Sequence, residues 1–113
     1  SFTGQIIDNL ISSAIKYSFQ GSAVDIRLKV TDGFAQIEVD DHGQGIPAEE
    51  LPNVFKRFAK ISSSPTAGES SSGMGLSIVN MLVNLLKGKI ECESSVGVGT
   101  LFTVRLPLKI EDL

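Results

Sequence analysis

The sequence has one cysteine, one histidine and no long apolar run among its 113 residues. A single cysteine excludes an internal disulfide, and so few Cys and His side chains exclude a zinc-type cluster. No apolar segment approaches the length of a membrane-spanning helix, and no signal-type segment opens the chain. We therefore expect a soluble, cytoplasmic domain without direct membrane contact, although a longer parent chain could be anchored in a membrane.

The charges are not segregated along the chain. Ten Lys and Arg residues against 13 Asp and Glu residues give a net charge of −3, and the cations are scattered rather than gathered in a stripe. This pattern argues against a nucleic acid or an anionic membrane as partner, because both select basic patches, and it favours a small ligand. The length allows one hydrophobic core but not two, so residues 1–113 are expected to form one domain.

The hydrophobic pattern predicts a helix followed by a hairpin. Apolar residues between Gln5 and Lys16 recur in pairs every four residues, which is the stripe of an amphipathic helix. From Ala23 to Thr31 the pattern changes to alternation, which predicts a half-buried strand. The sequence TDGF at 31–34 carries the Asp-Gly signal of a tight turn, and a second alternating strand follows it.

The second strand runs into a polar stretch that contains two glycines, VDDHGQGIP at 39–47. Because side chains alternate along a strand, Asp41 falls on the same inward face as Ile37 and Val39, whereas Asp40 points to water. A buried carboxylate is costly unless donors surround it, so Asp41 should have a designated partner. Two alternatives remain open here: Asp41 binds a ligand, or it caps the turn through HGQG.

The rest of the chain predicts further helices and strands around one long loop. A short helical stretch at 48–58 precedes residues 59–72, which are rich in Ser and too long for an ordinary loop, so we interpret them as a mobile lid. A helix at 76–86 and two strands joined by a turn at 95–99 complete the chain. The predicted fold is α+β, a two-layer α/β sandwich with helices on one face of a mixed, mostly antiparallel sheet.

Three Gly-x-Gly pairs stand where one element passes into the next, and any single pair is typical of a turn. The pair in SSSGMGLSIV differs, because it leads directly into a helix whose free N–H groups and positive dipole end favour an anion such as phosphate. Neither a P-loop motif nor the glycine motif of dinucleotide folds occurs. The three pairs are Gly43/Gly45, Gly73/Gly75 and Gly97/Gly99.

These segments, in this order, resemble the ATP-binding domain of sensor histidine kinases, in the superfamily that includes gyrase, Hsp90-type chaperones and MutL. QIIDNLISSAIKYS resembles the N box, DDHGQGIP the first glycine box, VFKRF the F box, SSSGMGLSIV the second glycine box and SSVGVGTLFTVRLP the closing hairpin. The resemblance covers essentially the whole chain. It implies a Bergerat-type fold, ATP and Mg²⁺ as cofactors, a lid at 59–72 and an N-terminal truncation before the N box.

The resemblance also implies the roles of individual residues. Asp41 would accept a hydrogen bond from the adenine amino group, while Asn9 and Lys16 would reach the phosphates as catalytic residues. Asn9 and Ser13 would hold Mg²⁺. The nucleotide-binding positions implied in this way are Asn9, Ser13, Lys16, Tyr17, Asp41, Gly43, Gly45, Ile46, Phe55, Arg57, Phe58, Lys60, Ser72, Gly73, Met74, Gly75, Leu76 and Thr100.

The implied activity is transfer of the ATP γ-phosphoryl group to a histidine on a separate dimerisation domain of the parent protein, with a response regulator downstream. Hydrolysing members of the superfamily carry a glutamate at the position of Asn9, and its absence favours transfer to an acceptor other than water. His42 is a poor acceptor, because it adjoins the adenine-binding Asp41. Ser13 stands where the family has asparagine, which keeps open a non-catalytic nucleotide-binding module that regulates a partner.

Overall fold

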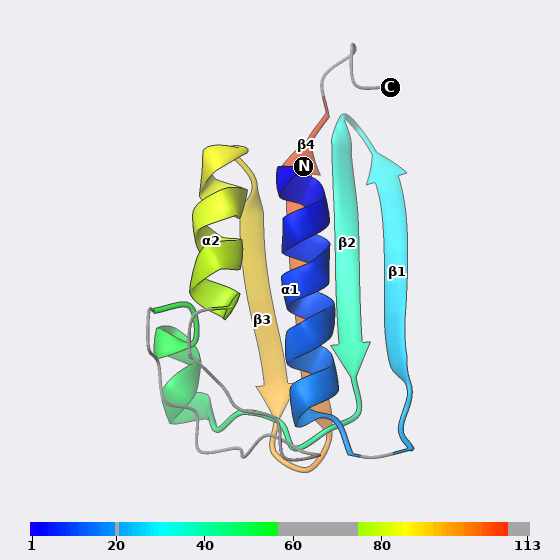
Figure 1. The fold of residues 1–113 in the computed structure, drawn as a ribbon, viewed down its shortest axis with the longest axis vertical. Helices are drawn as coiled ribbons and strands as arrows, with labels where there is room; N and C mark the ends of the chain where they lie inside the picture. The colour runs from blue at the N-terminus through cyan, green and yellow to red at the C-terminus, as the bar shows by residue number, and fades with distance from the viewer. Residues whose placement is uncertain (20, 57–74, 109–113) are drawn as a thin grey trace.

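The structure is a computed structural model that describes residues 1–19, 21–56 and 75–108 (Figure 1). Its elements in chain order are α1 (Phe2–Tyr17), β1 (Val24–Thr31), β2 (Phe34–Asp41), the 3₁₀ helix η1 (Ala48–Asn53), α2 (Gly75–Leu85), β3 (Lys89–Ser95) and β4 (Gly99–Pro107). The predicted lid at 59–72 lies outside the described residues. None of the described helices has the length and apolar character that a membrane crossing requires.

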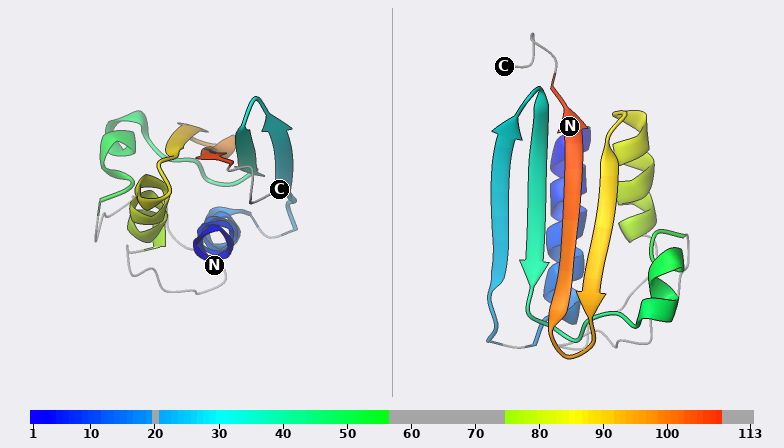
Figure 2. Two further views of the ribbon diagram at one scale, coloured as in Figure 1. Left: turned by 90° about the horizontal axis from the view of Figure 1, so that it is seen from above. Right: turned by 180° about the vertical axis from the view of Figure 1, so that it is seen from behind.

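The four described strands form one antiparallel sheet in the order β1-β2-β4-β3. The last strand, β4, lies beside β2, so the hairpins β1–β2 and β3–β4 join edge to edge. Both α-helices pack on the same face of this sheet, and the opposite face is left open by the described elements (Figure 2). The two-layer α+β fold is therefore confirmed, and the sheet is antiparallel throughout the described strands rather than mixed.

The core lies between the helices and the two central strands. Along β2 and β4 the register places Ile37 beside Val104 and Val39 beside Phe102, so their side chains form one apolar surface. α1 covers this surface with every fourth residue of its predicted stripe, and α2 packs beside it. The buried core residues are Ile6, Leu10, Ala14, Ile37, Val39, Val79, Leu82, Val83, Phe102, Val104 and Leu106.

The prediction that β1 is half-buried is wrong. Ile26, Leu28 and Val30 point to the helix side of the sheet, yet they are 50%, 67% and 60% exposed. β1 is an edge strand, and the described helices lie over the other strands of the sheet (Figure 1). Alternation therefore identified the strand and its faces correctly, but which face is covered depends on where the helices pack.

Local sequence explains where the elements begin and turn. Ser1 caps α1, because its hydroxyl accepts a hydrogen bond from the Gly4 N–H at 3.1 Å. The β1–β2 turn has positive φ at both Asp32 and Gly33, the conformation for which an Asp-Gly pair is suited. In the described part of the helical stretch predicted at 48–58, residues 48–56, the structure has only a short 3₁₀ helix, η1, with Pro52 inside it. A proline cannot donate the backbone hydrogen bond that a longer helix would need.

Candidate functional site

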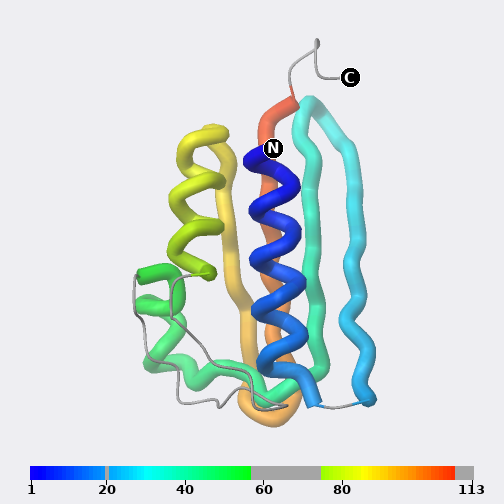
Figure 3. Tube along the Cα trace, in the orientation of Figure 1, coloured from blue at the N-terminus to red at the C-terminus, as the bar shows by residue number. Residues whose placement is uncertain are grey.

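Three segments that are distant in sequence meet at one end of the sandwich. They are the C-terminal end of α1, the chain that follows β2, and the β3–β4 turn (Figure 3). The backbone of Gln44 links them, because its N–H donates to the Tyr17 carbonyl at 3.0 Å while its carbonyl accepts from the Gly97 N–H at 2.9 Å. These two backbone hydrogen bonds join the end of α1, the segment after β2 and the β3–β4 turn, and we call these three joined segments the interlocked unit.

Glycines make that unit possible. A Cβ on Gly43 would collide with the carbonyl of Tyr17, and a Cβ on Gly45 with the carbonyl of Ser95. Gly45 also has a positive φ of 76°, which L side chains rarely adopt. The resemblance implied that Gly43 and Gly45 are nucleotide-binding positions. The structure gives a structural reason for both glycines, the close approach of backbone to backbone.

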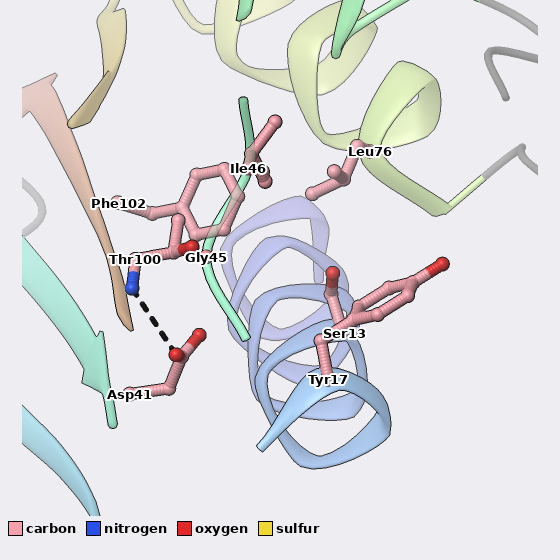
Figure 4. A pocket seen from close by; sticks show the side chains of 8 residues that line it. All are labelled: Ser13, Tyr17, Asp41, Gly45, Ile46, Leu76, Thr100 and Phe102. Carbon is pink, nitrogen blue, oxygen red and sulfur yellow. Dashed lines mark hydrogen bonds between the residues drawn. The ribbon is translucent and has the colours of Figure 1, made fainter. Parts of the chain in front are cut away.

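A pocket opens where the interlocked unit meets α1 and α2 (Figure 4). Asp41 and Thr100 project from the sheet side, and Ser13 and Tyr17 come from α1, with the Tyr17 ring extending away from Asp41. Apolar side chains from the segment after β2, from α2 and from β4 complete the lining. The lining residues are Ser13, Tyr17, Asp41, Gly45, Ile46, Leu76, Thr100 and Phe102.

Asp41 is the charged group of this lining and is only 4% exposed. Its Oδ1 accepts two backbone hydrogen bonds, from the Gly43 N–H at 3.0 Å and the Thr100 N–H at 3.1 Å. Burial raises the pKa of Asp41 above its usual value, and these two N–H groups oppose that rise. Both of these hydrogen bonds go to Oδ1, so that oxygen caps the turn, and among the described residues no hydrogen bond to Oδ2 is seen.

The position of the neighbouring Asp40 confirms the prediction from strand alternation that Asp40 points away from the buried face. It points to the open face of the sheet, where its Oδ2 accepts from Arg27 Nη2 at 3.1 Å. Arg27 also donates to Glu38 at 2.7 Å on that face. His42 lies toward the open face as well, 3.2 Å from Asp25, with both side chains about half exposed. The two consecutive aspartates therefore face opposite sides of the sheet, as alternation predicts.

A hydroxyl cluster on β3 and β4 supports the pocket. The Ser94 hydroxyl accepts from the Ile46 N–H at 2.7 Å, donates to the Gly99 carbonyl at 3.0 Å, and lies 2.8 Å from the Thr100 hydroxyl. Ser94 was not singled out from the sequence. The signal for it was present, because Ser94 continues the inward phase of Ile90 and Cys92 and is polar, as Asp41 is on β2.

The polar face of α1 extends from the pocket toward the N-terminus of α2. Asn9 precedes Ser13 by one turn, its Nδ2 donates to the Gln5 carbonyl at 2.8 Å, and its Oδ1 lies beside Gly75, the first residue of α2. Lys16 is half-buried in the last turn of α1. This arrangement leaves the Asn9 carbonyl oxygen facing the region where an anion would meet the helix N-terminus.

The structure brings many of the predicted site residues together and separates others from the pocket. Seven of them line it: Ser13, Tyr17, Asp41, Gly45, Ile46, Leu76 and Thr100. Phe55 does not line it, but its ring packs edge-on against the lining residue Phe102, with the centroids 6.1 Å apart. Phe102 was not among the site residues predicted from the sequence. The positions outside the described residues are Arg57, Phe58, Lys60, Ser72, Gly73 and Met74.

The single cysteine, Cys92, does not line the pocket. Cys92 packs against the hydrophobic core, and burial raises the pKa of its thiol to about 12. A thiol with such a pKa carries almost no thiolate at neutral pH, which is the reactive form. Cys92 is therefore a small hydrophobic residue at the core rather than a reactive thiol.

The fold and the pocket define a class of protein. An antiparallel sheet with helices on one face, and an acceptor carboxylate at the end of a strand beside a glycine-linked turn, match the expected ATP-binding domain. The chain belongs to the histidine kinase-, DNA gyrase B- and HSP90-like ATPase family, which matches residues 1–110. Within that family it is an ATP-binding catalytic domain of the sensor histidine kinase type.

Individual relatives support this placement. The chain is 39% identical over 111 residues to the autoinducer 2 sensor kinase/phosphatase LuxQ of Vibrio cholerae, covering 96% of this chain and 13% of that protein. It is 36% identical over 104 residues to the sensor histidine kinase RcsC of Escherichia coli, and this match covers 92% of this chain and 11% of RcsC. These relatives are kinases by name, which favours the catalytic interpretation over a non-catalytic module.

Solved structures agree with the sequence relatives. The mycobacterial sensor histidine kinase MprB superposes with a TM-score of 0.83 at 31% identity, covering 94% of this chain and 72% of that chain. Full-length ShkA, solved in complex with AMPPNP, superposes with a TM-score of 0.78 at 25% identity, and the match covers 94% of this chain and 21% of the ShkA chain. The chain spans 13% of the length of LuxQ and 11% of that of RcsC, so it is a small part of these curated relatives.

Proposed function

We propose that this domain binds ATP with Mg²⁺ and transfers the γ-phosphoryl group to a histidine on a separate dimerisation domain of the parent protein. The observation that carries the proposal is Asp41, a buried carboxylate with one oxygen held by two backbone N–H groups and the other left as an acceptor in the pocket. Such an acceptor suits the amino group of adenine.

The face of α1 supports an extended position for the nucleotide. Tyr17 lines the base end of the pocket, and Asn9 lies two turns earlier, about 12 Å along the helix at 1.5 Å per residue. At that point the Asn9 side chain adjoins the N-terminus of α2, where N–H groups and the helix dipole favour phosphate. The triphosphate would thus run along α1, away from Asp41 and toward Asn9.

The side chains at the phosphate end favour transfer to an acceptor over hydrolysis. Asn9 occupies the position from which a glutamate would activate water, and an amide cannot take up a proton. Asp41, which could, lies at the base end. An acceptor histidine must then come from elsewhere in the parent protein, with a response regulator as the next acceptor.

The donors at the phosphate end fit Mg²⁺. The Asn9 carbonyl and the Ser13 hydroxyl are hard oxygen ligands one helical turn apart, and Asn9 Nδ2 is already turned toward Gln5. Within residues 1–19, 21–56 and 75–108 no three His, Cys, Asp or Glu side chains gather to hold a metal, so the ion would be shared with phosphate oxygens. When bound, Mg²⁺ would neutralise charge on the transferring phosphoryl group.

The test is phosphotransfer in trans. The chain is incubated with labelled Mg·ATP and a separately supplied, histidine-bearing helical domain of the parent. The buffer has near-neutral pH, in keeping with the proposed cytoplasmic location. We expect acid-labile phosphate on the supplied domain and none on this chain alone. ATP binding without any transfer would support the non-catalytic module instead, and label on His42 would contradict the proposed geometry.

A further inference from the structure

Ser94 makes three hydrogen-bonding contacts behind two residues that line the pocket, Ile46 and Thr100. Its hydroxyl lies 2.7 Å from the Ile46 nitrogen, 3.0 Å from the Gly99 carbonyl oxygen and 2.8 Å from the Thr100 hydroxyl oxygen. Ser94 itself does not line the pocket, whereas Ile46 and Thr100 do. It therefore touches the ligand site only through its neighbours.

The hydrogens of these three contacts can be assigned by counting. A hydroxyl has one proton to donate and two lone pairs to accept with. The Ile46 N–H can only donate, so it uses one lone pair of Ser94, and the Gly99 carbonyl can only accept, so it takes the Ser94 proton. The third contact is satisfied only if the Thr100 hydroxyl donates its proton to the remaining lone pair of Ser94.

This assignment determines what Thr100 presents to a ligand. With its single proton directed at Ser94, the Thr100 hydroxyl has only lone pairs left for the pocket. Asp41 Oδ2 is also an acceptor there, and the Thr100 N–H is already donated to Asp41 Oδ1 at 3.1 Å. The sheet side of the pocket therefore offers two acceptors and no side-chain donor from this pair.

We infer that Ser94 is a positioning residue that orients the Thr100 hydroxyl as an acceptor and so makes the pocket select a 6-amino over a 6-oxo purine. The inference rests on the proposed binding of ATP. An amino group at position 6 donates to such acceptors, whereas an oxygen at that position would meet their lone pairs. Without Ser94 the Thr100 hydroxyl can rotate and donate to the oxygen, so discrimination falls.

The experiment compares ATP with inosine triphosphate, which carries an oxygen in place of the 6-amino group. Calorimetry measures both dissociation constants for the full 113-residue chain, for Ser94→Ala and for the control Ser95→Ala, whose side chain is exposed. We expect Ser94→Ala to reduce the preference for ATP about fivefold, the value of one neutral hydrogen bond, with no change in the control. Ser94→Thr retains the hydroxyl and should retain the preference.

A merely structural role for Ser94 predicts a different result. It would weaken both nucleotides by the same factor and leave their ratio unchanged, which would overturn the inference. If Ser94→Ala does not fold, Thr100→Val removes the same acceptor and should lower the ratio to a similar extent; an unchanged ratio there would also overturn it. Failure of the unaltered chain to bind ATP would instead overturn the proposed function on which the inference rests.

Discussion

At the scale of single residues, Asp41 combines a structural role with the role proposed for it in binding. The sequence left open whether it caps a turn or binds a ligand, and the structure shows the cap. Oδ1 accepts from the N–H groups of Gly43 and Thr100, which belong to different strand ends, and the side chain lines the pocket. In the proposed function, this cap fixes the orientation in which Oδ2 would meet adenine.

The first prediction tests the proposed role of Asp41 in binding adenine separately from its role in capping the turn. In Asp41→Asn the amide oxygen can keep both backbone hydrogen bonds, so the fold should survive, but the amide nitrogen then points a donor at the donor of adenine. ATP affinity measured by calorimetry should fall about 100-fold or more, as for loss of a charge-assisted hydrogen bond with its partner left unpaired. Asp40→Asn is the control, since Asp40 faces Arg27 on the open face. Unchanged affinity in Asp41→Asn would refute the adenine assignment.

A second prediction tests the departure from the family at position 13. Ser13 lines the pocket on α1, so Ser13→Asn should place an amide carbonyl where the family has its metal ligand. Phosphotransfer to the supplied acceptor domain should rise about tenfold, equivalent to about 1.4 kcal/mol in the barrier, whereas metal-free ATP binding should change little.

The control for position 13 is Ser12→Asn, which places the same residue on the exposed side of the same helix. Both variants are compared in a Mg²⁺ titration with the acceptor domain present. Equal rates and equal Mg²⁺ dependence for Ser13→Asn and the unaltered chain would show that the serine already fulfils the role of the asparagine.

At the scale of elements, glycines join the end of α1, the segment after β2 and the β3–β4 turn. Gly-x-Gly pairs had been interpreted from the sequence as turns or ligand contacts, because a sequence pattern cannot show which backbone will lie against which. Gly45 and Gly97 both have positive φ, 76° and 82°. A Cβ on Gly45 would meet the Ser95 backbone, whereas nothing lies within 4 Å of a Cβ on Gly97.

A third prediction uses this matched pair. Gly97→Ala carries only the cost of a left-handed conformation, while Gly45→Ala adds a collision between backbone segments. The free energy of unfolding from urea denaturation should be lower by about 2 kcal/mol or more in Gly45→Ala than in Gly97→Ala. Equal losses in the two variants would show that the interlocked unit can open to admit a methyl group.

At the scale of the whole molecule, the helices decide which parts of the sheet are core. Leu28 and Ile37 are direct neighbours on β1 and β2 and point to the same side of the sheet. Ile37 is 4% exposed and Leu28 is 67% exposed, because the described helices lie over the other strands of the sheet and leave this part of β1 uncovered (Figure 1). The alternating patterns of the two strands are equally regular, so sequence alone could not distinguish these two positions.

The fourth prediction follows from that difference. Ile37→Ala leaves a cavity in a packed core and should reduce the free energy of unfolding by about 3 kcal/mol. Leu28→Ala removes mostly exposed surface and should cost about 0.5 kcal/mol. Chemical denaturation of both variants measures the contrast; a similar loss for Leu28→Ala would mean that this face of β1 is covered in solution.

Much of the fold and part of the site were determined by the sequence alone. The period of the apolar residues specified the helices and strands, the Asp-Gly pair specified the first turn, and the phase of β2 directed Asp41 inward and Asp40 outward. The order of the motifs identified the family. These features depend on local backbone geometry, which is determined by residues that are close together in the sequence.

Tertiary structure alone decided the remainder. It placed β4 beside β2, left the helix-side face of β1 uncovered, set the carbonyls of Tyr17 and Ser95 against glycines, and brought Ser94 to Thr100. Each of these facts depends on which distant segments pack together, and that is governed by the shape of the assembled layers. A pattern within one element cannot contain that information, because the partner surface is supplied by another part of the chain.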